Sequence, residues 1–95
     1  MNLSAEDARR YVNRQVIPHL GTGLVARLPE LRISDSKIVW RVPVELSLPQ
    51  LGNLGEVGFI QVDAHSGEIA FTAEEQARII NHAQRLYRGA TLPTK

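Results

Sequence analysis

A stretch of alternating side chains over residues 38–48 constrains most strongly what this chain can fold into. Its residues between the apolar ones are mostly polar, the period-two pattern of a strand with one face against a core. The apolar set is Ile38, Trp40, Val42, Val44, Leu46 and Leu48. Pro43 interrupts the stretch and has no N–H to donate, so we expect it at a sheet edge or at a bulge.

A second apolar run, residues 56–64, differs because apolar residues occur on both of its faces. This pattern is typical of a central strand buried on both faces, or of a strand whose second face is an interface. Gly58 lies within the run and indicates that another element approaches closely there.

Turn residues separate the predicted strands. In the sequence DAHSGE, Gly67 can adopt positive φ and Asp63 can accept hydrogen bonds from the amides of the turn. We therefore predict a hairpin that ends in a short strand. Leu31 and Ile33 predict an earlier strand, which turns through residues 34–36 into the main strand.

Helices are predicted near both ends of the chain. Ser4 is a candidate N-cap for a short amphipathic helix that ends before Pro18. A longer helix over residues 73–88 begins with a capping box at residues 72–75 and ends at Gly89.

The order of these elements predicts the fold class. Residues 18–30 are interpreted as a flexible connection, residues 48–55 as an exposed loop and residues 90–95 as a loose tail. The apolar face of the sheet needs a cover, and the helical stripes provide it. We predict one α+β domain over residues 1–95, a two-layer sandwich in which an antiparallel sheet of three to four strands packs against an N-terminal and a C-terminal helix.

Composition narrows the functional classes. A net charge of +1 does not favour strong attraction to nucleic acid or to an anionic membrane. The absence of cysteine excludes disulfides, thiol chemistry and thiolate metal sites. The first twenty residues are charged and lack an apolar run, so neither a signal peptide nor a membrane span is expected and the predicted compartment is the cytoplasm.

No catalytic constellation, metal site or cofactor site is predicted. His19, His65 and His82 are not at metal-ligand spacing. Asp63, His65 and Glu68 could converge at the hairpin tip as ligands, although an ordinary turn accounts for the same residues. The chain is therefore interpreted as non-catalytic.

A partner interface is the leading hypothesis for function. The connection after the main strand carries a cluster of leucines, which marks an interface or folds back onto the core. Arginines on the last helix face either an acidic partner or only water. The predicted interface residues are Leu48, Leu51, Leu54, Val57, Phe59, Arg78 and Arg85.

The central residues resemble a known family. The strand VWRV at residues 39–42 and the segment VDAHSGEI at residues 62–69 are similar to the W-x-V strand and VDA-x-T-G-E-I hairpin of PepSY-type domains. The resemblance covers roughly residues 4–71 and departs at Ser66, where threonine is commoner, and in the extra C-terminal helix. It implies a non-catalytic interaction or inhibitory domain.

The sequence thus predicts a small PepSY-like interaction or regulatory module that binds one protein partner or self-associates, most simply as a two-fold dimer. Two alternatives stay open. The size and layout are similar to those of small bacterial proteins that accompany a toxin, which would make the chain an antitoxin-like partner whose last helix could also touch DNA. The other is a small-ligand or metal-binding domain that uses the tip at residues 63–68.

Overall fold

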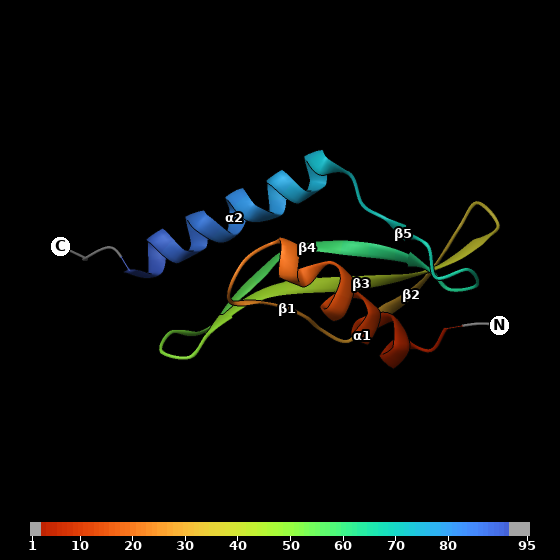
Figure 1. Ribbon diagram of the computed structural model, residues 1–95, viewed down its shortest axis with the longest axis horizontal. Helices are drawn as coiled ribbons and strands as arrows, with labels where there is room; N and C mark the ends of the chain where they lie inside the picture. Colours follow the sequence, from red (N-terminus) through yellow and green to blue (C-terminus); the bar gives the residue numbers. More distant parts are fainter. Residues whose placement is uncertain (1–2, 92–95) are drawn as a thin grey trace.

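The computed structural model describes residues 3–91, apart from the side chains of Ser34 and Thr91 (Figure 1). The elements in chain order are α1 (Ala5–Gln15), the 3₁₀ helix η1 (Ile17–His19), β1 (Leu24–Ala26), β2 (Glu30–Ser34), β3 (Lys37–Leu48), β4 (Gly52–Asp63), β5 (Ile69–Ala70) and α2 (Ala73–Thr91). The predicted α+β class with an antiparallel sheet is confirmed.

The sheet is organised around β3. β4 pairs with one side of β3, and β1 and β2 pair one after the other with its opposite side. β5 pairs with the far side of β4, at Gln61 and Val62 only. The sheet has five strands because β1, three residues long, lies inside the segment 18–30 that was expected to be a loop.

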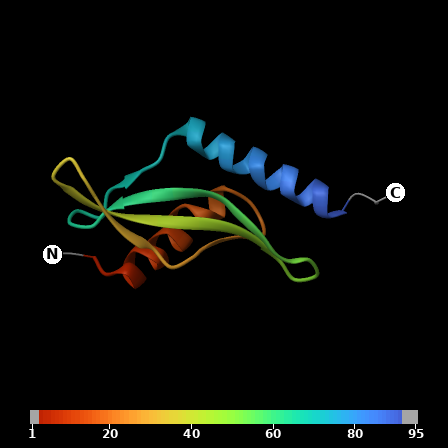
Figure 2. The ribbon, with the colours of Figure 1, turned by 180° about the vertical axis from the view of Figure 1, so that it is seen from behind.

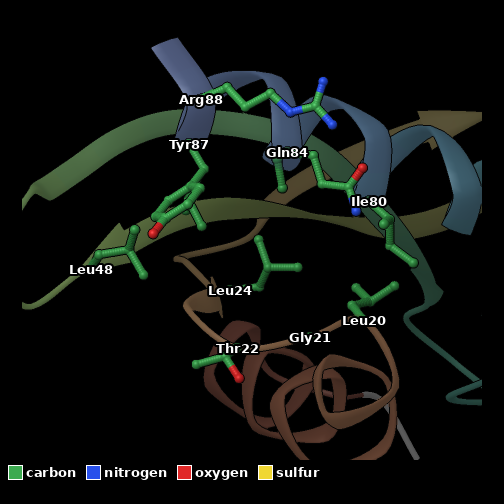
Figure 3. Close-up of a pocket in the computed structure, with 11 residues that line it drawn as sticks. Leu20, Gly21, Thr22, Leu24, Leu48, Ile80, Gln84, Tyr87 and Arg88 are labelled. Atoms are coloured by element: carbon green, nitrogen blue, oxygen red, sulfur yellow. The ribbon is translucent and has the colours of Figure 1, made fainter. Parts of the chain in front are cut away.

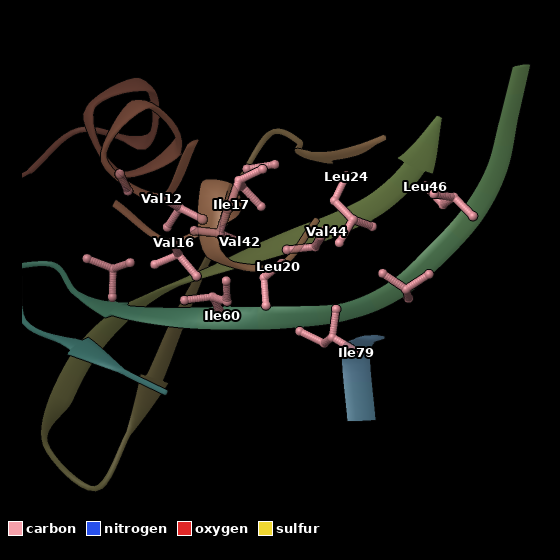
Figure 4. Close-up of a cluster of buried hydrophobic side chains, with 14 residues drawn as sticks. Val12, Val16, Ile17, Leu20, Leu24, Val42, Val44, Leu46, Ile60 and Ile79 are labelled. Carbon is pink, nitrogen blue, oxygen red and sulfur yellow. The ribbon is translucent and has the colours of Figure 1, made fainter. Parts of the chain in front are cut away.

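α1 lies behind the sheet in Figure 2, and α2 packs on the same face, because Ile79 lies over Gly58, which is paired with the buried Val44. This arrangement gives the predicted two layers. The core forms between the inner face of β3 and β4 and the apolar stripe of α1, which continues through η1 (Figure 4). α2 covers less of the sheet, and Ile79 is the one buried residue among its described side chains. The main core residues are Ala8, Val12, Val16, Ile17, Leu20, Val42, Val44, Leu46, Ile60, Val62 and Ile79.

The predicted helix starts are confirmed by their capping bonds. The amide of Asp7 donates to Ser4 Oγ at 3.1 Å, and the amide of Glu75 donates to Thr72 Oγ1 at 3.1 Å. The predicted end of α2 at Gly89 is wrong, because the helix continues to Thr91. Glycine inside a helix costs only about 1 kcal/mol, which the next turn of hydrogen bonds can offset. The rest of the expected tail, residues 92–95, lies outside the described residues.

Pro43 does not lie on an edge strand, but the expected irregularity of the ladder is present opposite it, where the register of β3 shifts by one residue between β1 and β2. Pro43 lies in the middle of β3, the central strand, and its carbonyl accepts the amide of Arg27 at 2.8 Å. Its nitrogen therefore faces the break between the end of β1 and the start of β2. No ladder hydrogen bond is lost there, because no strand residue is present to accept one.

The connection between β3 and β4 is shorter than the expected loop over residues 48–55. The strands are joined at residues 49–51, and the pairing skips Leu54 and Val57 of β4. Two extra residues on one strand are β-bulges, which bend and twist the ladder. Val57 is 5% exposed as a result, whereas Phe59 and Gln61 remain exposed on the outer face.

Gly58 confirms the predicted close approach of another element. A Cβ at this position would lie 2.6 Å from Cγ1 of Ile79 on α2. A side chain at position 58 would force Ile79 or the backbone to shift, so α2 sits close to β4 because Gly58 leaves room for it.

We predict that Gly58→Ala lowers the free energy of unfolding by about 1–3 kcal/mol, the usual cost of overpacking a core. In an Ile79→Ala background the same change should be neutral or stabilising. Gly89→Ala is the matched control, since a Cβ there meets open space and should stabilise the helix by about 1 kcal/mol. Urea unfolding of the four variants measures these effects, and an equal cost of Gly58→Ala in both backgrounds would contradict a clash with Ile79 as the cause.

Candidate interaction surface

The β2–β3 hairpin forms an arm that projects beyond the N-terminal end of α1 (Figures 1 and 2). Its turn consists of Asp35 and Ser36, with φ of 46° and 68°. The predicted hairpin is confirmed, although neither turn residue is glycine. Left-handed backbone costs roughly 1–2 kcal/mol per non-glycine residue, and aspartate tolerates it better than most.

Three large aliphatic side chains are exposed on one face of this arm, and we call them the arm patch. Leu31, Ile33 and Ile38 are 53%, 76% and 48% exposed. Ile33 lies opposite Ile38 in the ladder, and Leu31 lies opposite Trp40. The arm patch therefore belongs to the face of the sheet that forms the core, at the place where no helix covers it.

A groove of about 700 Å³ lies at the base of the arm, between the arm, Leu3 and the turn after β4. Trp40 lines it and is half-buried. The indole N–H donates to the carbonyl of Leu3 at 2.9 Å, and the Leu3 amide donates to the carbonyl of Ala64 at 2.7 Å. Because the polar atom of Trp40 is already bonded, its ring offers the groove mainly an apolar surface.

The opposite face of the arm is charged. Glu30 lies 3.6 Å from Arg32 of the same strand and 3.5 Å from Arg41 of β3. Arg41 also pairs with Glu56 at 2.8 Å, and its guanidinium lies 4.3 Å from the ring centroid of Phe59. The arm thus has one aliphatic face and one face that carries both signs of charge.

The hairpin tip after β4 is a turn held by one carboxylate. Oδ1 of Asp63 accepts the amides of His65 and Ser66 at 2.8 and 2.9 Å. The amide of Ser66, together with that of His65, holds the pKa of the Asp63 carboxyl below its usual range. Within residues 3–91, no three His, Asp or Glu side chains converge in a way that could hold a metal ion.

The lowered pKa of Asp63 predicts a pH-dependent contribution to stability. A group whose pKa is depressed on folding stabilises the protein above its unfolded-state pKa, about 4 for aspartate, and the contribution is lost as the pH falls through the folded-state value. The stability difference between wild type and Asp63→Ala, measured by urea unfolding, should be full at neutral pH and shrink below about pH 4. Asp63→Asn keeps an acceptor without the charge and is the control. A wild-type-minus-alanine difference that does not change with pH would refute this role.

The predicted leucine cluster is divided between core and surface. Leu48 and Leu54 are half-buried and pack against the core, whereas Leu51 is 39% exposed. Val57, predicted with them, is buried inside the domain. The leucines therefore do not form one continuous exposed patch, and their part in an interface stays a prediction.

Arg78 and Arg85, two of the predicted interface residues, lie beside a third, Phe59. Arg78, Arg85 and Phe59 line a shallow hollow of about 290 Å³ between α2 and β4. Arg78 lies 3.8 Å from Glu74 one helical turn earlier, and both side chains are largely exposed. Such a pair contributes little to stability.

A second groove, of about 560 Å³, separates α2 from the loop after η1 (Figure 3). Leu20, Leu24 and Leu48 face Ile80 and Tyr87 across it, and Gln84 and Arg88 lie at its rim. On α2, Ile79 is buried, whereas Ile80, Ala83 and Leu86 are only partly buried against the core, which leaves the groove beside them. It is mostly apolar and open to solvent.

Neither helix within residues 3–91 is both long and apolar enough to cross a lipid bilayer. Comparison of the chain with protein-family models, curated proteins and solved structures gave no match. The PepSY resemblance therefore stays a prediction that depends on residues 39–42 and 62–69 alone.

Sequence reasoning placed Leu31, Ile33 and Ile38 in strands but did not identify them as a surface. The sequence did contain a signal. The apolar alternation that begins at Ile38 is longer than the segment that the predicted N-terminal helix could cover. α1 has 11 residues and spans about 16 Å, whereas β3 has 12 residues and spans about 40 Å.

Proposed function

We propose that this chain is a small non-catalytic protein-interaction module, PepSY-like in character, that engages its partner through the arm patch. The observation that carries the proposal is the exposure of Leu31, Ile33 and Ile38 on one face of a projecting hairpin. Single exposed aliphatic residues are ordinary on protein surfaces, but a contiguous group is typical of an interface.

The surroundings of the arm patch support this proposal. The neighbouring groove is lined by Trp40, and tryptophan is among the residues that contribute most to binding at interfaces. Charged residues on the opposite face, Glu30 and Arg32, keep that face solvated. On the face of the patch itself, Lys37, Asp63 and Ser66 line the same groove as Leu31 and Ile38. An apolar centre beside a polar rim is the usual anatomy of an interface.

The proposal predicts that a charge on the arm patch abolishes assembly. Ile33→Asp and Ile38→Asp should each weaken the complex at least about tenfold, because burying a carboxylate at an apolar contact costs more than 1.4 kcal/mol. Tagged wild type and variants are purified from the source cells, and the stoichiometry of each eluate is measured by native mass spectrometry.

Asn81→Asp, on the exposed side of α2, is the matched control for added charge. A species present at a fixed ratio with wild type and control but lost with both arm variants would support the proposal, and its mass separates a second copy from a different partner such as a small toxin. An assembly that survives both arm variants would refute it, and so would a wild type that is monomeric and without partner.

A further inference from the structure

We propose that the open edge of the arm is paired by a second copy of this chain, through antiparallel pairing of β2 with β2 about a two-fold axis at Leu31, which sets the two arm patches side by side. The inference rests on the proposed function and names the partner at the same surface. Three independent features of β2 agree with it: an open backbone edge, the direction of its amides, and the order of its charges.

The edge of β2 is open within the described structure, because β2 pairs with β3 on one side only. Its residues Glu30, Leu31, Arg32 and Ile33 are all exposed. An uncovered edge strand is a ready template for another strand, and proteins that remain monomeric usually protect such an edge.

The amides that face this edge can be identified from the ladder. The N–H and C=O of one strand residue point to the same side, and that side alternates along the strand. Pro43 accepts the amide of Arg27, so odd-numbered residues of β3 face β1 and β2. Leu31 lies opposite Trp40, an even-numbered residue, so Leu31 and Ile33 direct their backbone groups away from β3 and toward the open edge.

A two-fold axis that passes between the two Leu31 residues is consistent with these directions of the backbone groups. Leu31 of each copy then donates its N–H to the carbonyl of Leu31 in the other. Ile33 lies across from Pro29 of the second copy, which is buried and has no N–H to donate. Pro29 therefore ends the pairing at both sides and limits it to β2.

The side chains select the same axis. In this register Glu30 of one copy lies opposite Arg32 of the second copy, and Arg32 opposite Glu30, so both cross-strand pairs are attractive. Moving the axis by one residue places Arg32 opposite Arg32 or Glu30 opposite Glu30, which is repulsive. The sequence Glu30-Leu31-Arg32 is thus complementary to itself when reversed.

The same pairing also brings apolar side chains of the two copies into contact. Leu31 meets its counterpart on the inner side of the joined sheets, and Ile33 lies diagonally beside it, within reach of a long side chain. The contact is one short strand per copy, far smaller than an obligate interface. We therefore expect a dimer that forms and dissociates with concentration.

Cysteine cross-linking tests the register directly, because the chain has no cysteine of its own. Across a hydrogen-bonded antiparallel pair the Cα atoms are about 5.5 Å apart, within the range that a disulfide spans. Leu31→Cys should therefore form a covalent dimer on mild oxidation. In the same register the two Ile33 positions are offset by about 14 Å along the strands, so Ile33→Cys should not.

Ile33→Cys is a stringent control, because Ile33 is more exposed than Leu31 and random collisions would favour it. Non-reducing electrophoresis across a range of protein concentrations measures the dimer, and circular dichroism verifies the fold of each variant. Faster linkage at position 33, equal linkage at both positions, or linkage at neither would overturn the proposed pairing.

A charge experiment tests the same interface without cysteine. Glu30→Lys leaves two cations on the edge and Arg32→Glu leaves two anions, so each variant alone should self-associate at least about tenfold more weakly than wild type. Mixed together, the two variants should form a heterodimer, because every cross-strand pair is again attractive. Sedimentation of one labelled variant with and without the other measures this, and a mixture as dissociated as its components would overturn the register.

The outcomes also separate this inference from the proposed function. If the arm-patch variants Ile33→Asp and Ile38→Asp lose a different protein while Leu31→Cys never links, the surface is an interface but its occupant is not a second copy. If Ile33→Asp and Ile38→Asp leave every assembly unchanged and Leu31→Cys never links, both proposals fail together.

Discussion

The structure depends on a mismatch in length between the central strand and the helix that covers it. β3 extends for about 40 Å, and the apolar alternation that creates the core continues along it. α1 spans about 16 Å and covers only the middle of that face. α2 adds cover toward the opposite end, where Ile79 fits over Gly58. The uncovered remainder is the arm, so the exposed aliphatic residues follow from the same pattern that produces the core.

Much of the fold could be predicted because its signals are local. The alternation over residues 38–48 is visible in sequence, and so are the capping residues Ser4 and Thr72 and the turn at Gly67, each of which acts on its immediate neighbours. Gly58 is the one long-range feature that was anticipated, because a glycine inside a strand often marks the place where another element comes close. Local consistency of this kind is what a single sequence shows best.

The features that could not be predicted depend on partners distant in the chain. β1 has three residues, too few for an alternation to be recognised, and exists because β3 offers it an edge. Pro43 is tolerated in the central strand only because β1 and β2 leave a break opposite it. The arm patch is exposed because of where α1 begins and how far it reaches. None of these conditions can be read from the residues concerned.

The charges of β2 link the edge of the sheet to its surface. Charged side chains on an edge strand normally oppose pairing with other strands, and Glu30 and Arg32 would oppose most sequences placed beside them. They have opposite signs and are symmetric about Leu31, so a second copy in antiparallel register pairs both of them with an opposite charge. The same residues therefore protect the edge from foreign strands and permit a copy, which is specificity obtained by penalising the alternatives.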